Sequence, residues 1–127
     1  MKPELEKKLQ EKYPTLFQNC SKPPSDSLMC FGCECGNGWY DLIDRTCEKL
    51  SKLNVVLEQV KEKFAGLRIY ISNSTDEAFE VCEEAEKESF KICEICGKEG
   101  KICSSGFWYT TLCPDHQKEL KYTSCRK

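Results

Sequence analysis

Histidine is nearly absent from this sequence: His116 is the only one in 127 residues. If that side chain has another task, no histidine base remains to activate a nucleophile. No phosphate-binding loop or dinucleotide-binding signature occurs, and no carboxylate pair stands out beyond one acidic stretch. From these absences we expect a protein that is not an enzyme.

Long hydrophobic runs are also missing, so we expect no membrane-spanning helix and no membrane partner. The first residues are charged and amphipathic without an apolar segment, which argues against a secretory signal peptide. Basic residues do not dominate, and the formal net charge of −2 argues against a general nucleic-acid binder. We therefore expect a cytoplasmic protein.

Cysteine, in contrast, is abundant, with eleven residues. The odd count and the absence of an export signal favour reduced thiols. Cys93 and Cys96 have two residues between them, as do Cys113 and His116. Two such pairs suit a tetrahedral Zn²⁺ ion. Because three thiolates and one imidazole complete the tetrahedron, we expect one structural Zn²⁺ site with no vacancy for catalysis.

The segment between the two ligand pairs predicts a hairpin. Residues 101–112 read as two short strands around a Ser-Ser-Gly turn, and residues 117–122 are helix formers. Gly97 directly follows Cys96 and supplies the backbone freedom that a zinc knuckle, the tight turn that carries the first ligand pair, requires. A knuckle, a hairpin and a ligand pair that opens a helix follow the order of treble-clef zinc modules, which residues 93–127 resemble.

A second group of cysteines lies nearer the N-terminus. Cys30, Cys33 and Cys35 are close together, and Cys20 or Cys47 would make a set of four. The spacing is irregular and no matching pair follows, so we do not favour a second metal site. The alternative is that these thiols are small buried residues in a turn.

A glycine-rich turn precedes the next predicted helix. Gly36 and Gly38 flank Asn37, and Trp39 follows directly. Such a turn leaves the N–H groups of a helix N-terminus open to phosphate or carboxylate, so Gly36, Gly38 and Trp39 are candidate ligand-binding residues. The alternative is an ordinary N-terminal turn.

The strongest helical pattern covers residues 39–64, where apolar residues recur at intervals of three and four. The members of this seam are Trp39, Ile43, Cys47, Leu50, Leu53, Leu57, Val60 and Phe64. We expect one long central helix, which Asn54 or the Val55-Val56 pair could divide. The seam favours the core, although part of it could serve a homodimer.

A strand is predicted at residues 67–71, with Arg68 and Tyr70 on the face opposite the apolar residues. Together with Lys61 and Lys63, they would form a basic and aromatic patch. Such a patch can hold a phosphate and stack a base, so all four are candidate ligand-binding residues. The alternative is an ordinary solvated strand face.

Two further helices are expected. The first covers residues 3–13, and the second begins near Asp76 after a cap at Ser74 or Thr75. The second helix is acidic, which is typical of a solvated surface or of a surface that binds a basic partner or imitates phosphate. We expect the tail, residues 123–127, to fray.

These elements predict an α+β fold with a long central helix, a short antiparallel sheet and a C-terminal treble-clef-like zinc lobe. Residues 1–92, with the helix at 39–64 and the strand at 67–71, and residues 93–127 would together form one compact unit.

Three stretches in this order resemble a family of small proteins of unknown function encoded by bacteriophages and prophages. They are the Cys-Gly-Asn-Gly-Trp-Tyr-Asp-Leu-Ile run at 35–43, the Val-Lys-Glu-Lys-Phe-Ala-Gly-Leu-Arg-Ile-Tyr run at 60–70, and the C-terminal ligand pairs. His116 stands where that family often has cysteine. Cys30, Cys33 and Cys103 look like local additions. The resemblance implies a phage protein in the cytosol of a host cell.

The expected function is therefore binding without catalysis. One version is a counter-defence protein that inhibits a host protein through the acidic helix or the zinc lobe. Another sequesters a nucleotide signal at the glycine turn and the basic patch. The alternative is an accessory or regulatory phage protein that binds nucleic acid.

Overall fold

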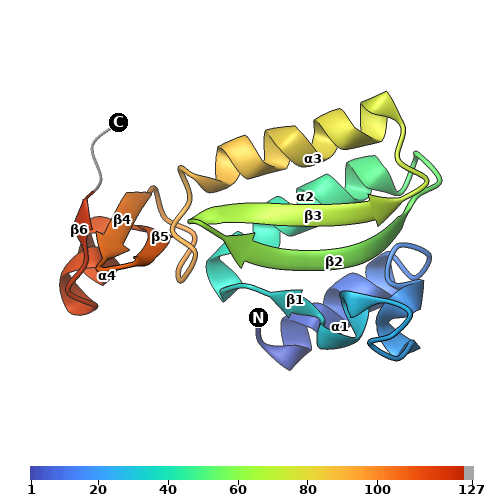
Figure 1. Cartoon of the computed structure of the whole chain (residues 1–127), viewed down its shortest axis with the longest axis horizontal. Coiled ribbons are helices and arrows are strands. Elements are labelled where there is room, and N and C mark those ends of the chain that lie inside the picture. Colours follow the sequence, from blue (N-terminus) through green and yellow to red (C-terminus); the bar gives the residue numbers. More distant parts are fainter. Residues whose placement is uncertain (125–127) are drawn as a thin grey trace.

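The computed structural model describes residues 1–124 and divides them into two connected parts (Figure 1). The larger part, residues 1–90, is called the body below and holds one three-stranded sheet and three α-helices. The C-terminal lobe, residues 91–124, holds a second three-stranded sheet and a short helix. Residues 125–127, with Cys125 and the rest of the predicted tail, lie outside the described residues.

The chain begins with the expected helix, α1, at Pro3–Lys12. Proline in the first turn has no N–H to leave unpaired, and Tyr13 ends the helix. Two short 3₁₀ helices follow, η1 at Gln18–Ser21 and η2 at Leu28–Phe31.

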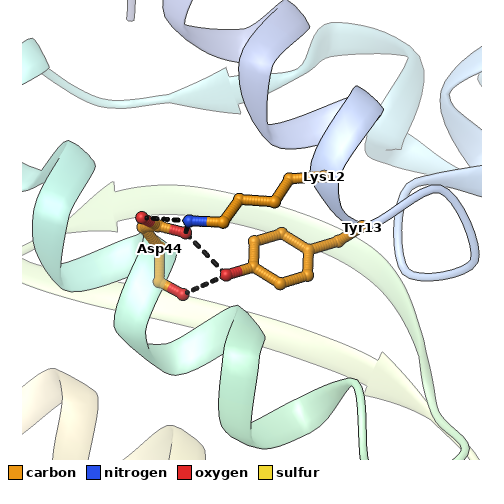
Figure 2. A network of polar contacts seen from close by, with 3 residues as sticks. All are labelled: Lys12, Tyr13 and Asp44. Carbon is orange, nitrogen blue, oxygen red and sulfur yellow. Dashed lines mark hydrogen bonds and ion pairs between the residues drawn. The ribbon is translucent and has the colours of Figure 1, made fainter.

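The end of α1 is fastened to helix α2, Tyr40–Leu50, by Asp44 (Figure 2). The Tyr13 hydroxyl donates to Asp44 Oδ1 at 2.6 Å, and Lys12 Nζ lies 3.0 Å from both carboxylate oxygens. Burial alone would raise the pKa of Asp44, but the hydrogen bonds from Tyr13 and Lys12 outweigh it and lower the pKa. The carboxylate therefore stays charged near neutral pH.

The predicted single helix over residues 39–64 is wrong. A 3₁₀ turn, η3, occupies Asn37–Trp39, α2 ends at Leu50, and strand β2 covers Val56–Lys63. The chain turns at Asn54, which has a positive φ of 56°, and β-branched Val55 and Val56 then favour a strand.

A bulge in β2 explains why the sequence resembled a helix there. The pairing of β2 with its neighbour shifts between Leu57 and Gln59. One extra residue brings Leu57 and Val60 to the same buried face although they are three positions apart. A helix would give the same spacing, so periodicity alone could not separate the two.

The first sheet has the order β1-β2-β3. Strand β3, Gly66–Ser72, confirms the predicted strand and pairs antiparallel with β2 across a turn at Phe64 and Ala65, both with positive φ. The sequence did not predict β1, Cys33–Glu34, which runs parallel to β2, so the sheet is mixed.

Helix α3, Asp76–Ser89, begins where predicted, and its cap is Thr75, whose hydroxyl accepts from the N–H of Ala78. Buried Ala78, Ala85 and Ser89 let α3 pack against α2 and β3. Figure 1 shows α3 lying along β3, the last strand of the sheet. There the Ser89 hydroxyl accepts from the N–H of Leu67 at 2.9 Å, so the helix covers part of the exposed edge.

The lobe contains the predicted hairpin, in which β4, Lys101–Ser105, pairs with β5, Trp108–Leu112. Helix α4, Pro114–Glu119, starts before the predicted range. Strand β6, Thr123–Ser124, pairs with β4, so the prediction of a frayed tail is wrong for these two residues.

The two parts have separate hydrophobic clusters. The body cluster surrounds Trp39, which is fully buried, and draws on α1, α2 and the first sheet. The lobe cluster has only four buried members, Cys93, Cys103, Leu112 and Cys113, with Tyr122 packed against them. The fold is thus mixed α and β, with a Cys/His group at the centre of its smaller part.

Candidate metal centre

The first ligand pair lies in a tight turn between Ile92 and Glu99, which form an isolated β-bridge. The N–H of Cys93 donates to the carbonyl oxygen of Lys98 at 2.7 Å, and the N–H of Gly97 donates back to Cys93 at 2.9 Å. Gly97 has a φ of 83°, which a residue with a side chain rarely adopts, so the glycine fits the turn that the spacing predicted.

The second pair lies where β5 ends and α4 begins. Cys113 precedes the first helical residue, Pro114, and its carbonyl oxygen accepts from the N–H of Gln117 at 2.9 Å. His116 is in the first turn of the helix, so the chain itself carries the imidazole back toward the thiol of Cys113.

The four side chains come together as predicted: the ligand atoms of Cys93, Cys96, Cys113 and His116 all lie within 4.8 Å of one another. Cys113 Sγ is 3.2 Å from His116 Nδ1, Cys93 Sγ is 3.6 Å from the same nitrogen, and Cys96 Sγ is 3.6 Å from Cys113 Sγ. A tetrahedral zinc site has sulfur–sulfur edges of about 3.8 Å and sulfur–nitrogen edges of about 3.6 Å. These three distances fit one ion held by four protein ligands.

The local electrostatics favour a thiolate at one ligand. The backbone N–H of His116 donates to the sulfur of Cys113 and, with the His116 side chain and the other two thiols, lowers the pKa of Cys113 to about 6. At Cys96, desolvation is the largest effect and raises the pKa. A cation at the centre would favour the thiolate forms of all three cysteines, because metal binding displaces their protons.

The glycine turn that we expected to be open for a ligand packs against this centre instead. The N–H of Gly36 donates to Glu94 Oε2 at 2.8 Å, and the N–H of Gly38 donates to the Glu94 carbonyl oxygen at 2.7 Å. Trp39 is buried in the body, and its Nε1–H donates to the carbonyl oxygen of Ile92 at 2.9 Å. Protein groups therefore already use the donors of Gly36, Gly38 and Trp39.

Close approach explains the two glycines. A Cβ on Gly38 would overlap the carbonyl oxygen of Cys93 and lie 2.6 Å from the nitrogen of Gly97. A Cβ on Gly36 would overlap the carbonyl oxygen of Glu94. Only glycine lets the body reach the backbone of the metal turn.

A second contact joins the lobe to the hairpin of the first sheet. The Thr111 hydroxyl donates to the carbonyl oxygen of Ala65 at 2.8 Å, and both residues are buried. Sequence reasoning missed Glu94, Ile92 and Thr111 as the residues that fix the lobe. The glycine spacing was the only available signal, and we interpreted it as an opening for a ligand.

The predicted basic patch is brought together only in part. Lys61 lies directly opposite Arg68 in the pairing of β2 and β3, and Tyr70 follows on the same face. Arg68 Nε, however, lies 3.2 Å from Glu86 Oε2 on α3, so its charge is balanced. Lys63 is exposed beside the turn of the hairpin.

The cysteines of the body have a different environment. Cys33, Cys35 and Cys47 are buried, and this burial raises the pKa of Cys35 and Cys47 to about 12 and that of Cys33 further. These thiols therefore keep their protons near neutral pH. Within residues 1–124, the group at Cys93 is the only set of three or more Cys, His, Asp or Glu side chains close enough to share an ion.

Comparisons with protein-family models, curated proteins and solved structures found no significant match to this chain. No helix within residues 1–124 combines the length and the apolar character that crossing a membrane requires.

Proposed function

We propose that Cys93, Cys96, Cys113 and His116 bind one structural Zn²⁺ ion in a treble-clef-like lobe. The convergence of these four ligand atoms carries the proposal. Three sulfur ligands and one nitrogen ligand suit Zn²⁺, whereas Mg²⁺ and Ca²⁺ prefer oxygen. Four protein ligands leave no position for water, so the ion acts on the fold and not on a substrate.

The protein then acts by binding. The only histidine is a ligand, and burial holds Cys33, Cys35 and Cys47 as thiols that are poor nucleophiles. We infer that the partner is a protein. Support comes from Arg68, which is paired with Glu86 and is thus a weak site for a phosphate, and from the exposed acidic residues of α3.

The resemblance of the glycine turn, the β2–β3 hairpin and the ligand pairs to phage-encoded proteins adds a setting. We propose that the chain is a phage-type protein that works in the cytosol of a host cell and inhibits a host defence protein. Expression of the chain should then raise the plating efficiency of a phage on a host that carries the defence.

Photo-crosslinking within the host cell tests the binding function. A photoreactive residue is placed at Phe79 on α3, at Trp108 on the lobe, and at Glu119 as an exposed control. We expect a discrete protein adduct that nuclease treatment does not change. Absence of any specific adduct from Phe79 and Trp108 would contradict a binding function.

A second candidate, binding to nucleic acid, has one observation in its favour. The turn of the β4–β5 hairpin carries Phe107 and Trp108, which are 97% and 73% exposed. Exposed aromatic rings can stack on unpaired bases. A nuclease-sensitive adduct that forms from Trp108 but not from Phe79 would support this candidate over a protein partner.

A further inference from the structure

A continuous surface with apolar side chains at its centre lies on the outer side of the first sheet. Two grooves meet at Tyr70: one runs toward η2 and includes Leu28, and the other lies between β3 and α3 and includes Phe79. A third hollow on α3 continues past Phe79. We call these three together the Tyr70 surface.

Three side chains give this surface its apolar centre. Leu28, Tyr70 and Phe79 are 41%, 42% and 58% exposed, and they come from three separate elements. The alternation of β3 sends Leu67 and Ile69 into the core and therefore turns Tyr70 outward. Buried Ala78 and Ala85 fix the orientation of α3, which leaves Phe79 beside the groove.

The rim of the Tyr70 surface is acidic on both sides. Asp26 and Glu58 line the groove toward η2, and Glu83 and Glu86 line the groove beside α3. The third hollow adds the acidic residues Asp76, Glu80 and Glu84. The only basic residues among those that line the three hollows are Arg68 and Lys87.

Most of this acidic charge is not neutralised within the chain. Arg68 pairs with Glu86, whereas no described residue forms an ion pair with Asp76, Glu80, Glu83 or Glu84. Side chains of like charge repel when they crowd one helix face, and a cation that binds there relieves the repulsion. The surface is thus complementary to positive charge.

We infer that the Tyr70 surface binds a lysine- or arginine-rich segment of the partner protein that also carries an apolar side chain. The inference depends on the proposed protein-binding function and specifies its partner. The apolar side chain would contact Tyr70 and Phe79, and the cations would face Glu80 and Glu83. Aromatic faces add to the attraction because they also bind cations.

The same charges oppose an anionic ligand here. A phosphate near Tyr70 would meet Glu58 and Glu83 on either side, and the nearest guanidinium already has a carboxylate partner. Nucleic acid is therefore the less favourable occupant of this surface.

The test is a titration of the isotope-labelled, zinc-loaded full chain, followed residue by residue in NMR spectra. The probe is a short peptide in which lysines alternate with glycines around a central leucine. A matched peptide has glutamate in place of each lysine. We expect saturable shifts at Tyr70, Phe79 and Glu83 with the lysine peptide only, and weaker binding at higher salt.

Two double variants with the same net charge distinguish an effect of the Tyr70 surface on binding from an effect of the protein's overall charge. Glu80→Lys with Glu83→Lys changes the rim, and Glu4→Lys with Glu119→Lys changes exposed sites on α1 and α4. We expect the rim variant to weaken binding about tenfold or more and the control to change it by less than about threefold. Tyr70→Ala should weaken binding while the spectrum of the lobe is retained.

Each other outcome overturns the inference. Equal binding of the glutamate peptide, equal loss in the two double variants, or shifts confined to Phe107 and Trp108 would exclude the Tyr70 surface as the basic-peptide site. If the Tyr70 surface is excluded but nuclease-resistant crosslinks still form from Trp108, the proposed protein-binding function stands. Only the assignment of the binding site to the Tyr70 surface then fails. If no crosslink forms either, both fail.

Discussion

The body and the lobe reach a stable structure by different means. The body buries large side chains such as Leu9, Trp39 and Leu57 in one cluster. The hydrophobic cluster of the lobe has four buried members, of which Cys93 and Cys113 are candidate ligands and only Leu112 is a large aliphatic side chain. A segment of this size rarely folds on burial alone, and metals or disulfides commonly supply what is missing. Hydrophobic burial therefore accounts for the body, whereas the lobe has a much smaller cluster and, in our proposal, depends on coordination.

A backbone group takes part in each of the hydrogen bonds described above between the two parts. Glu94 accepts from Gly36 and Gly38, and Trp39 donates to Ile92. Such contacts need both surfaces to hold a fixed backbone shape, and on the side of the lobe the ligand turn provides it. The proposed ion would therefore also stabilise the junction with the body.

Loss of a ligand should have the largest effect and should unfold the lobe while the body stays folded. In Cys113→Ser we expect the lobe to unfold at neutral pH, because coordination of structural zinc is worth on the order of 10 kcal/mol or more. Hydrogen exchange should rise across residues 93–124 while α2 and β2 stay protected. Cys30→Ser, at a half-buried cysteine outside the group, is the control and should retain the metal.

Gly38→Ala should break the junction. The new Cβ would overlap the backbone of Cys93, which cannot move aside as a side chain can, so we expect a loss of about 3 kcal/mol or more in the free energy of unfolding. Gly106→Ala is the matched control, since no atom lies within 4 Å of its Cβ and only its φ of 64° opposes alanine. Its expected cost is about 1 kcal/mol. Chemical denaturation of both variants measures the difference, and equal losses would contradict the junction.

Leu57→Ala should affect the body and leave the metal in place. Leu57 is fully buried, and removal of its side chain should cost about 3 kcal/mol through lost burial and a cavity. The zinc content of the folded variant, measured by mass spectrometry, should equal that of the wild type. Loss of zinc from folded Leu57→Ala would show that the two parts do not depend on different forces.

Tyr13→Phe should give the smallest effect, about 1 kcal/mol, because the Tyr13 hydroxyl no longer donates to the carboxylate and the carbonyl oxygen of Asp44. Because the pKa of Asp44 is lowered in the folded protein, its contribution is present above the unfolded pKa and is lost as pH falls through the folded pKa. The difference between wild type and variant should thus be greatest near neutral pH and shrink below about pH 4. A difference independent of pH would argue against the Asp44 contact.

The sequence predicted the lobe better than the body, for a physical reason. The convergence of Cys93 and His116 could be predicted from spacing alone, since ligand pairs and a tight turn are local features. The hairpin of the lobe is local as well and was also correct, and the cap of α3 is Thr75, one of the two residues that the sequence offered. The boundary between α2 and β2 depends on pairing with β3 and on a bulge, which the pattern around Leu57 cannot reveal.

The glycine turn illustrates the same limit at the site. Gly36 and Gly38 were recognised as positions of close approach, but the group that approaches them comes from Glu94, far along the chain. Nothing in the local sequence distinguishes a protein carboxylate from that of a ligand. Arg68 was likewise expected to be free, and its partner Glu86 lies on a helix whose placement depends on the whole body.

Native mass spectrometry of the full chain, purified from bacterial cytosol without a chelator, measures directly whether the lobe holds a metal ion. We expect the mass of the chain plus one zinc ion, and the Cys113→Ser variant should lack that ion. A wild-type chain that is folded throughout its lobe and carries no metal would contradict the account.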